Sequence, residues 1–239
     1  DKNLRIVDLR APNLYTEAHI PGAVNLNSND LDIKKASGVQ DLNDPAKVAE
    51  VLGNLGIGSG NKVVLYDDQR TLSAARVFWV LDYLGHKDAV VLNGGYPKWA
   101  AEKREVTRTV PRPEKAVFTP KPDPTKVADD AYVAANMGEK SVVFCDARTP
   151  EEFEGSDVRA ERGGHIPGAK NINWEDNVTK DGTPIMKEAS ILKKQYDDAG
   201  ITPDKEVVTY CQTGVRAAQA YYVLKLLGYY KVRNYDGSW

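Results

Sequence analysis

Short runs of β-branched and aliphatic residues alternate along this chain with longer stretches whose apolar positions recur every three or four residues. The runs at residues 63–66 and 207–210 have the length and composition of buried strands. Val215, Ala218 and Tyr222 follow the second run at spacings of three and four, which is typical of one face of a helix. Strands that alternate with helices in this way predict an α/β fold in which helices flank parallel sheets.

The order of these features occurs twice along the chain. An Asp-x-Arg sequence at residues 8–10 returns at residues 146–148, and His-Ile-Pro-Gly-Ala at residues 19–23 returns at residues 165–169. The two strand-like runs follow these motifs in the same order in both halves. A repeat of this length indicates a duplicated structural unit, so we expect two related domains in tandem.

The boundary between the two copies is expected where prolines accumulate. Prolines recur through residues 110–124, and they disfavour helix and favour an extended connection. We therefore expect a first domain at residues 1–107, a linker at residues 108–124 and a second domain at residues 125–239. The second domain is expected to open with a helical stretch around residues 127–137 before its first strand.

Composition and charge indicate an ordinary soluble protein. The 239 residues are 41% hydrophobic and 28% charged, which is the balance of a globular chain. The formal net charge of −2 gives no general attraction to nucleic acid or to an anionic membrane. No apolar run approaches the ~20 residues that span a bilayer. We therefore expect no nucleic-acid or membrane partner, and a cytoplasmic location or a periplasmic one if a signal peptide has been removed.

The chain has two cysteines, Cys145 and Cys211, which is too few for a disulfide framework or a four-cysteine zinc site. Cys145 lies inside an apolar run immediately before Asp146, so we expect a buried and inert thiol. The sequence has neither a glycine-rich phosphate loop nor a cluster of metal ligands. No metal or nucleotide cofactor is therefore expected.

Cys211 lies where a strand-like run passes into an alanine-rich helix, which is the edge of a parallel sheet at which ligands gather. Backbone N–H groups at the start of the helix, the curvature that Gly214 permits and the charge of Arg216 all favour a thiolate. Such a thiolate can attack a sulfane sulfur, become a persulfide and pass the outer sulfur to a second nucleophile. The candidate loop comprises Cys211, Gln212, Thr213, Gly214, Val215 and Arg216.

Taken together, the paired motifs, the strand–cysteine–helix sequence and Tyr-Asp-Gly-Ser-Trp at residues 235–239 resemble the two-domain rhodanese family over nearly the entire chain. The resemblance implies two rhodanese-like domains, with the second domain active and Cys211 forming the persulfide. It also implies that residues 212–216 hold the sulfane sulfur through backbone donors. The only group bound covalently during the reaction would be a sulfur atom on Cys211. The partners would be a small anionic sulfur donor and an acceptor, either cyanide or a thiol, including a thiol of another protein.

The first copy lacks the cysteine. Asp67 occupies its position and cannot form a persulfide, and the loop at residues 67–73 is longer by one residue. The first domain is therefore expected to be catalytically inert and to close one side of a cleft. Trp99 is expected to correspond to Trp239 of the second copy, and His86, which lies in no repeated motif, is expected at the surface.

The identity of the sulfur donor is less directly encoded. The loop matches neither the strongly basic form that the family associates with thiosulfate nor the Cys-Gly-Ser-Gly form associated with 3-mercaptopyruvate, but Arg216 supplies a cation, and this favours thiosulfate. Arg148 and Arg162 are further candidates for anion binding. Arg148 has the alternative of pairing with a local carboxylate to fix the fold. A family arginine expected shortly after Asp-x-Arg is replaced by Glu152, so the substrate pocket cannot be carried over unchanged.

A role for histidine depends on how the domains meet. His19 and His165 occupy the same motif in both copies, which favours a structural role for the pair. His19 is nevertheless a candidate accessory residue across the cleft near Thr213, where it could assist proton transfer in mercaptopyruvate chemistry.

Two other classes of protein were weighed against this interpretation. Cysteine phosphatases place five residues between cysteine and arginine, whereas four separate Cys211 from Arg216 here, and the smaller loop suits a single sulfur atom. A non-catalytic sulfur carrier or binding module is the second alternative, because fold alone does not establish activity. The retained Cys211 argues against a binding module.

Overall fold

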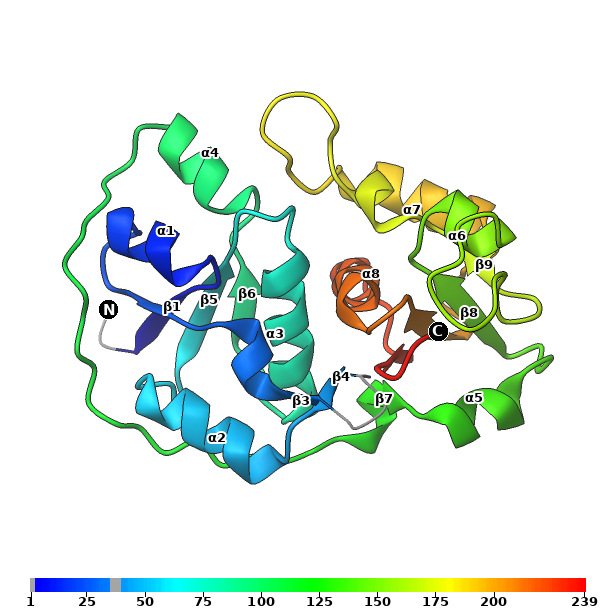
Figure 1. The fold of residues 1–239 in the computed structure, drawn as a ribbon, viewed down its shortest axis with the longest axis horizontal. Coiled ribbons are helices and arrows are strands. Elements are labelled where there is room, and N and C mark those ends of the chain that lie inside the picture. Colours follow the sequence, from blue (N-terminus) through cyan, green and yellow to red (C-terminus); the bar gives the residue numbers. More distant parts are fainter. Residues whose placement is uncertain (1–2, 35–39) are drawn as a thin grey trace. The chain divides into compact units, whose positions relative to one another are not determined.

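The computed structural model describes residues 3–34 and 40–239, which form two compact units (Figure 1). The first unit ends at Asp123 and also includes Asp181–Ile185, and the second contains Pro124–Lys180 and Met186–Trp239. Among the described residues, no helix combines the length and the apolar character needed to cross a membrane.

The described part of the first unit is built on a parallel sheet with the strand order β2-β1-β5-β6. Its strands are β1 (Leu4–Asp8), β2 (Ala23–Asn25), β5 (Lys62–Tyr66) and β6 (Ala89–Val91). The other elements are α1 (Pro12–Glu17), the 3-10 helix η1 (Ser28–Leu31), the hairpin β3 (Asp32–Lys34) and β4 (Gln40–Leu42), α2 (Pro45–Asn54), α3 (Leu72–Tyr83) and α4 (Gly95–Ala101).

The second unit repeats this arrangement with one more strand, in the order β7-β11-β10-β8-β9, again all parallel. Its strands are β7 (Val127–Ala128), β8 (Val142–Asp146), β9 (Lys170–Asn171), β10 (Glu206–Tyr210) and β11 (Val232–Tyr235). Its helices are η2 (Pro124–Lys126), α5 (Asp130–Asn136), α6 (Pro150–Glu154), η3 (Trp174–Asn177), α7 (Ala189–Asp198) and α8 (Val215–Leu226).

The prediction that the second domain opens with helix alone was wrong. Residues 127–128 form β7, which pairs with β11 at the sheet edge, and only α5 is helical. Asp129 ends the extended segment and caps α5 by accepting a hydrogen bond from Tyr132 N at 2.7 Å. A two-residue strand is too short to leave a period-2 pattern, so helical periodicity dominates the sequence there.

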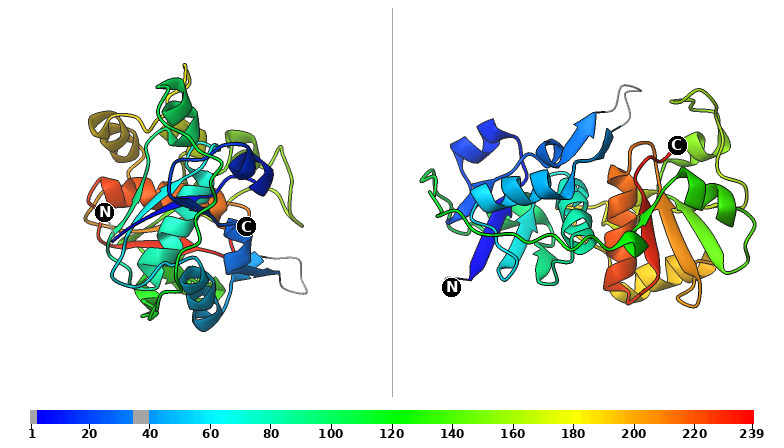
Figure 2. Two further views of the ribbon diagram at one scale, coloured as in Figure 1. Left: turned by 90° about the vertical axis from the view of Figure 1, so that its left-hand side faces the viewer. Right: turned by 90° about the horizontal axis from the view of Figure 1, so that it is seen from below.

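The two sheets correspond strand for strand, with β1, β2, β5 and β6 equivalent to β8, β9, β10 and β11. In each unit one long helix packs on the last two of these strands, α3 on β5 and β6 and α8 on β10 and β11 (Figure 2). Apolar side chains from the strands, from the His-Ile-Pro-Gly-Ala motif and from the shorter helices form a buried cluster in each unit. These buried residues include Tyr15, Ile20, Ala23 and Tyr66 in the first unit and Phe144, Ile166, Ala169, Val208 and Tyr210 in the second.

The Asp-x-Arg motifs form a buried ion pair at the end of β1 and of β8. Arg10 Nη2 lies 2.6 Å from Asp8 Oδ2, and Arg148 Nη2 lies 2.6 Å from Asp146 Oδ2, with both pairs almost completely buried. In the first unit the Tyr66 hydroxyl also donates to Asp8 Oδ2 at 2.5 Å. The motif therefore fixes the end of a central strand in both copies.

The proline-rich segment lies along the outside of the first unit, where Figure 1 shows it as an extended green trace. Ala116 N donates to Gly53 O at 3.0 Å, and Lys121 N donates to Leu84 O at 2.9 Å. Asp123 N then donates to Tyr83 O at 2.8 Å. These backbone bonds hold the segment against α2 and the end of α3.

Candidate active site

Cys211 is the first residue after β10, and its side chain is only 1% exposed. Three residues later Gly214 adopts the left-handed conformation, with φ 76° and ψ −13°, which turns the chain into α8. Glycine takes this conformation without the penalty that a Cβ imposes. The sequence therefore places the sulfur between the end of a buried strand and the unpaired N–H groups of the first helical turn.

The side chains of the loop are partly buried, and that of Gln212 makes a hydrogen bond to another segment. Gln212 Nε2 donates to Arg159 O at 3.2 Å, and Thr213 and Val215 are half-buried. Gln212 Oε1 is a buried acceptor without a hydrogen-bond partner among the residues that the structure describes. The residue that follows Cys211 thus carries a buried acceptor with no partner in the described part of the chain.

The Ser238 hydroxyl joins the two ends of the loop. It accepts hydrogen bonds from Cys211 N at 3.1 Å and from Gly214 N at 3.0 Å, and it donates to Tyr235 O at 2.8 Å. Cys211 Sγ lies 4.0 Å from the same oxygen. Sequence reasoning used the Tyr-Asp-Gly-Ser-Trp stretch only as part of the resemblance and did not assign this residue a role.

Replacing Ser238 with alanine leaves two buried N–H groups without an acceptor, which costs about 1–3 kcal/mol of stability. We expect the turnover per Cys211 to fall about tenfold, because one such hydrogen bond corresponds to about that factor. Steady-state sulfur transfer and urea unfolding measure the two effects. Ser156→Ala is the matched control, since the Ser156 hydroxyl makes one exposed bond to Glu151 O. Unchanged turnover in Ser238→Ala would show that the hydroxyl does not position the loop.

The last residue of the chain binds the nucleophile's own carbonyl. Trp239 N donates to Cys211 O at 3.0 Å, and Trp239 Nε1 donates to Arg162 O at 2.9 Å. In the first unit Tyr96 N donates to Asp67 O at 2.9 Å. Tyr96 is therefore the counterpart of Trp239, and the predicted correspondence with Trp99 was wrong.

This alignment makes Gly95 the counterpart of Ser238, with φ angles of 53° and 56°. A Cβ on Gly95 would lie 2.1 Å from Asp67 O, so the first unit has no room there for a side chain. The bridging hydroxyl is thus a feature of the copy that contains the cysteine.

Arg216 forms a two-pronged ion pair with Glu152, which lies 64 residues earlier in the sequence. Its Nη1 donates to Oε2 at 2.6 Å and its Nη2 donates to Oε1 at 2.9 Å. The Glu152 side chain is fully buried and that of Arg216 is 17% exposed. Burial alone would raise the pKa of Glu152, but the hydrogen bonds from Arg216 and from the Thr149 backbone lower it to about 2.

The guanidinium is held in its charged form in the same way. Burial alone would lower the pKa of Arg216, but its hydrogen bonds to Glu152 and its proximity to the Cys211 sulfur raise it. A permanent cation therefore stands beside the nucleophile, and its two terminal nitrogens are bound to a carboxylate.

Glu152 is placed by the local sequence at the start of α6. Thr149 Oγ1 accepts from Glu152 N at 3.3 Å, and Glu152 Oε2 accepts from Thr149 N at 3.2 Å, which forms a capping box. The Thr-x-x-Glu spacing is readable in the sequence, but the partnership with Arg216 is not. Glu152, which stands where the resemblance leads us to expect an arginine, is thus the ion-pair partner of Arg216.

This pair should give the protein a distinct acid sensitivity. A carboxyl whose pKa is lower in the folded than in the unfolded state stabilises the fold above its unfolded value, and this stability is lost as the pH falls through the folded value. For Glu152 the window runs from the usual value of about 4.3 down to about 2. Urea unfolding midpoints should therefore fall less steeply with acid in Glu152→Gln than in the wild type. The exposed Glu154→Gln is the control, and parallel pH curves for wild type and Glu152→Gln would contradict the assignment.

The guanidinium groups of the other two candidate arginines differ in whether they already have hydrogen-bond partners. Arg148 is 2% exposed and is held by Asp146 and by Gly164 O at 2.7 Å, so it serves the fold as Arg10 does. Arg162 is exposed, and only its backbone carbonyl has a hydrogen-bond partner among the described residues. Arg162 is therefore the predicted anion-binding side chain whose guanidinium is available.

His19 has no ring nitrogen available for a substrate. Its side chain is fully buried, with Nδ1 2.8 Å from Tyr15 O and Nε2 3.1 Å from Thr109 O. Its ring also stacks on Tyr15 at 4.0 Å between centroids. Both ring nitrogens therefore face carbonyl groups of the first unit, and His19 links α1 to the proline-rich segment.

Cys145 and Cys211 are both buried, but Cys145 lies inside a strand and Cys211 lies in the loop that follows one. Cys145 is 0% exposed inside β8, and burial followed by the charge of Asp146 raises the pKa of its thiol. A thiol in that setting is a poor nucleophile. The candidate chemistry is therefore confined to Cys211.

In the first unit, backbone N–H groups of this strand-to-helix junction bind the Asp67 side chain. The Asp67 carboxylate accepts from Gln69 N at 3.1 Å, from Thr71 N at 3.0 Å and from Ala74 N at 2.9 Å. Burial nevertheless raises the pKa of Asp67 against these hydrogen bonds. Several backbone donors thus converge on a buried acid at the position that Cys211 occupies in the second unit.

Comparison with known proteins identifies relatives over the whole chain. A sequence model described as a rhodanese-like domain matches residues 1–102 and 129–239. The thiosulfate sulfurtransferase of Azotobacter vinelandii is 36% identical over 240 residues, which cover 99% of this chain and 86% of that protein. The sulfur carrier protein TtuD of Thermus thermophilus is 39% identical over 249 residues, which cover 95% of this chain and 82% of that protein. Among solved structures, SseA of Escherichia coli, described as a 3-mercaptopyruvate sulfotransferase, superimposes with a TM-score of 0.86 at 26% identity, covering 100% of this chain and 94% of that one.

Proposed function

This chain belongs to the rhodanese-like family, and from that premise we propose that it is a thiosulfate sulfurtransferase whose Cys211 carries sulfur as a persulfide. The observation that carries the proposal is the position of Cys211 in the loop between β10 and α8, beside the charged Arg216. Relatives named thiosulfate sulfurtransferase over nearly the full length support the choice of reaction.

The proposed reaction has two displacement steps. The Cys211 thiolate attacks the outer sulfur of thiosulfate, the sulfur–sulfur bond of the donor breaks, and sulfite leaves with the bonding electron pair. The resulting persulfide is then attacked at its outer sulfur by cyanide or by a thiolate. Thiocyanate or a new persulfide leaves, and the Cys211 thiolate is restored.

Residues of the second unit would support both steps without taking part in bond making. Arg216 supplies positive charge beside the sulfur when the anionic thiolate or persulfide is present. The left-handed Gly214 and its hydrogen bond to Ser238 would hold the loop in one conformation. The only covalent passenger is sulfur, and we propose no metal or nucleotide cofactor.

Two further readings concern the partners. A 3-mercaptopyruvate donor is favoured by the similarity to SseA, and a thiol-containing protein as acceptor is favoured by the similarity to a sulfur carrier. We propose thiosulfate as donor because it is the substrate class named in several relatives at 35–37% identity.

The test is steady-state sulfur transfer from thiosulfate to cyanide by the purified chain, with 3-mercaptopyruvate and a phosphate ester as parallel substrates. Thiocyanate formation from thiosulfate supports the proposal. Faster turnover of 3-mercaptopyruvate would instead identify 3-mercaptopyruvate as the preferred donor. Turnover of neither sulfur donor would leave a carrier or binding role, and phosphate release alone would indicate phosphatase chemistry.

Arg162→Ala should raise the KM for thiosulfate about two- to fivefold with little change in kcat, because an exposed ion pair contributes up to about 1 kcal/mol. The effect should shrink as salt is added, since the guanidinium is exposed to solvent. Arg159→Ala is the matched control, because Arg159 Nη2 already binds Asp157 at 2.6 Å. Equal KM values in the wild type and Arg162→Ala would remove Arg162 from the donor site.

A further inference from the structure

The ion pair of Glu152 with Arg216 belongs only to the copy that contains the cysteine. Glu152 is the third residue of α6, and its counterpart in α1 is Leu14. Arg216 is the second residue of α8, and its counterpart in α3 is Ser73. Both partners are therefore replaced together in the first unit, one by an apolar side chain and the other by a small one.

The fold does not require this pair, because the first unit forms the same arrangement of strands and helices without it. Burial of a carboxylate with a guanidinium is costly, and apolar side chains at the same positions are often at least as stabilising. The pair also lies beside the nucleophile, since the Cys211 sulfur is among the groups that raise the pKa of Arg216. A costly pair in this place indicates a role in the chemistry of Cys211.

Glu152 cancels much of the positive charge that Arg216 would otherwise present to a reactant. The two carboxylate oxygens bind the two terminal nitrogens of the guanidinium, at 2.6 and 2.9 Å. The Glu152 side chain is fully buried, so solvent and salt screen the pair only weakly on that side. The field at the sulfur is therefore that of a compact ion pair, which is weaker than that of an isolated cation.

Arg159 adds little free positive charge. Its Nη2 lies 2.6 Å from Asp157 Oδ2, and its Nη1 lies 3.9 Å from Glu152 Oε2. Its side chain is 53% exposed, so its remaining charge is screened by solvent. A negatively charged reactant that approaches Cys211 thus meets guanidinium groups that already bind carboxylates.

We infer that Glu152 is a specificity-determining residue, which neutralises Arg216 and thereby lowers the preference of Cys211 for highly charged anions. Sulfur donors and acceptors with one negative charge or none are favoured in consequence. Glu152 acts through Arg216 and does not contact the reactants. For sulfur donors the inference rests on the proposed function, whereas the charge at Cys211 is measurable without sulfur transfer.

The first test compares the alkylation of Cys211 by iodoacetate and by iodoacetamide, which have similar sizes but differ by one negative charge. The ratio of the two second-order rate constants reports the local charge, because access and the fraction of thiolate affect both reagents alike. We expect Glu152→Gln to raise this ratio about three- to tenfold, since it removes one negative charge beside the guanidinium. Glutamine keeps the length of glutamate and can complete the capping box with Thr149.

Two further substitutions at the same position separate charge from structure. Glu152→Asp shortens the side chain but keeps the charge, so the alkylation ratio should stay within about twofold of the wild type. Glu152→Leu introduces the side chain type that Leu14 provides in the first unit, and it should raise the ratio as Glu152→Gln does. It also provides the uncharged variant if Glu152→Gln does not fold.

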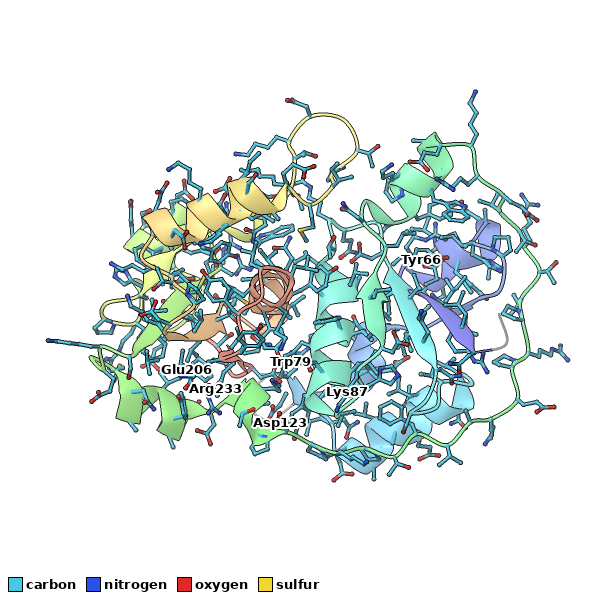
Figure 3. The ribbon with its side chains drawn as sticks, turned by 180° about the vertical axis from the view of Figure 1, so that it is seen from behind. Tyr66, Trp79, Lys87, Asp123, Glu206 and Arg233 are labelled. Carbon is cyan, nitrogen blue, oxygen red and sulfur yellow. The ribbon has the colours of Figure 1, made fainter. Side chains whose placement is uncertain are left out.

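Glu206→Gln is the matched control at the other end of a strand. Glu206 also pairs with an arginine, Arg233, and Figure 3 shows the two side by side. Glu206 is the first residue of β10, however, whereas Cys211 follows the last one. The alkylation ratio of this variant should equal that of the wild type.

The second test compares thiosulfate with the methanethiosulfonate anion, in which a methyl group replaces one charged oxygen. The Cys211 thiolate attacks the outer sulfur of either donor, the sulfur–sulfur bond breaks, and sulfite or methanesulfinate leaves with the electron pair. We expect Glu152→Gln to raise kcat/KM for thiosulfate about threefold or more relative to kcat/KM for methanethiosulfonate.

The inference is overturned if the alkylation ratio is the same in the wild type and Glu152→Gln, or if it rises as much in Glu152→Asp or Glu206→Gln. An unchanged preference between the two donors in an active Glu152→Gln enzyme also overturns it. A raised alkylation ratio in a protein that transfers sulfur from neither donor supports the role of Glu152 and contradicts only the proposed function.

Discussion

Cys211→Ser lowers sulfur transfer from thiosulfate to cyanide by about a thousandfold or more, to the level of the reaction without enzyme, because loss of a covalent nucleophile removes the entire two-step route. Serine keeps the size of the side chain and leaves the backbone bonds of Cys211 to Ser238 and Trp239 in place. Its hydroxyl is not ionised near neutral pH and cannot hold a transferable sulfur. Thiocyanate production at saturating thiosulfate measures the effect.

Cys145→Ala is the matched control for that substitution. Cys145 is fully buried in β8, so its loss affects packing and not the chemistry. We expect turnover within about twofold of the wild type, with a modest loss of stability on the scale of deleting a small buried group. Activity that survives in Cys211→Ser and disappears in Cys145→Ala would reverse the assignment of the nucleophile.

Arg216→Met destabilises the protein by about 3 kcal/mol and removes most of its activity, because the fully buried Glu152 loses its closest cation and keeps only Arg159 Nη1 at 3.9 Å and the Thr149 N–H at 3.2 Å. Methionine retains much of the length of arginine, so the loss of packing is small. The expected cost is therefore that of a buried carboxylate which has lost its two-pronged ion pair. Urea unfolding at pH 7 measures the stability, and sulfur transfer measures the activity.

The double variant Arg216→Met with Glu152→Leu separates charge from packing. Removal of both charges should recover stability to within about 1–2 kcal/mol of the wild type, apart from the capping bond to Thr149 that leucine cannot make. Activity should not return, since the cation beside Cys211 is still missing. A double variant as unstable as Arg216→Met would show that the unpaired carboxylate is not the cause.

The duplication and the burial of Cys145 were readable from the sequence. The repeated motifs and the 3.6-residue periodicity reflect local structure, and the burial of Cys145 follows from its place inside an apolar run. The family match over residues 1–102 and 129–239 agrees with the predicted tandem rhodanese-like domains. These features could be predicted because each is encoded within one short segment.

The contacts that shape the site could not be predicted in the same way. The partnership of Glu152 with Arg216 and that of Ser238 with Gly214 join residues distant in sequence and depend on how strands and helices pack. The prediction that His86 lies at the surface was wrong for the same reason, since its side chain is only 5% exposed. Sequence patterns identify which side chains are chemically able to bind a substrate. Packing determines which of them already bind another residue of the protein.

The Asp67 loop gives an internal comparison for the chemistry of the second unit. Its backbone donors converge on a carboxylate, and Gly95 leaves no room for a bridging hydroxyl. The second unit has Cys211 and Ser238 at the corresponding positions. The same strand-to-helix junction thus holds a buried carboxylate in the first unit and a cysteine in the second.

The most direct test of the central claim is the mass of the Cys211 peptide after the protein has been treated with thiosulfate and then alkylated. Trypsin cleavage after Lys205 and Arg216 places Cys211 in residues 206–216, and cleavage after Lys140 and Arg148 places Cys145 in residues 141–148. The account predicts that the first peptide gains one sulfur atom, that cyanide removes it, and that the second peptide is unchanged. Turnover of thiosulfate without added sulfur on residues 206–216, or with the sulfur on residues 141–148, would contradict it.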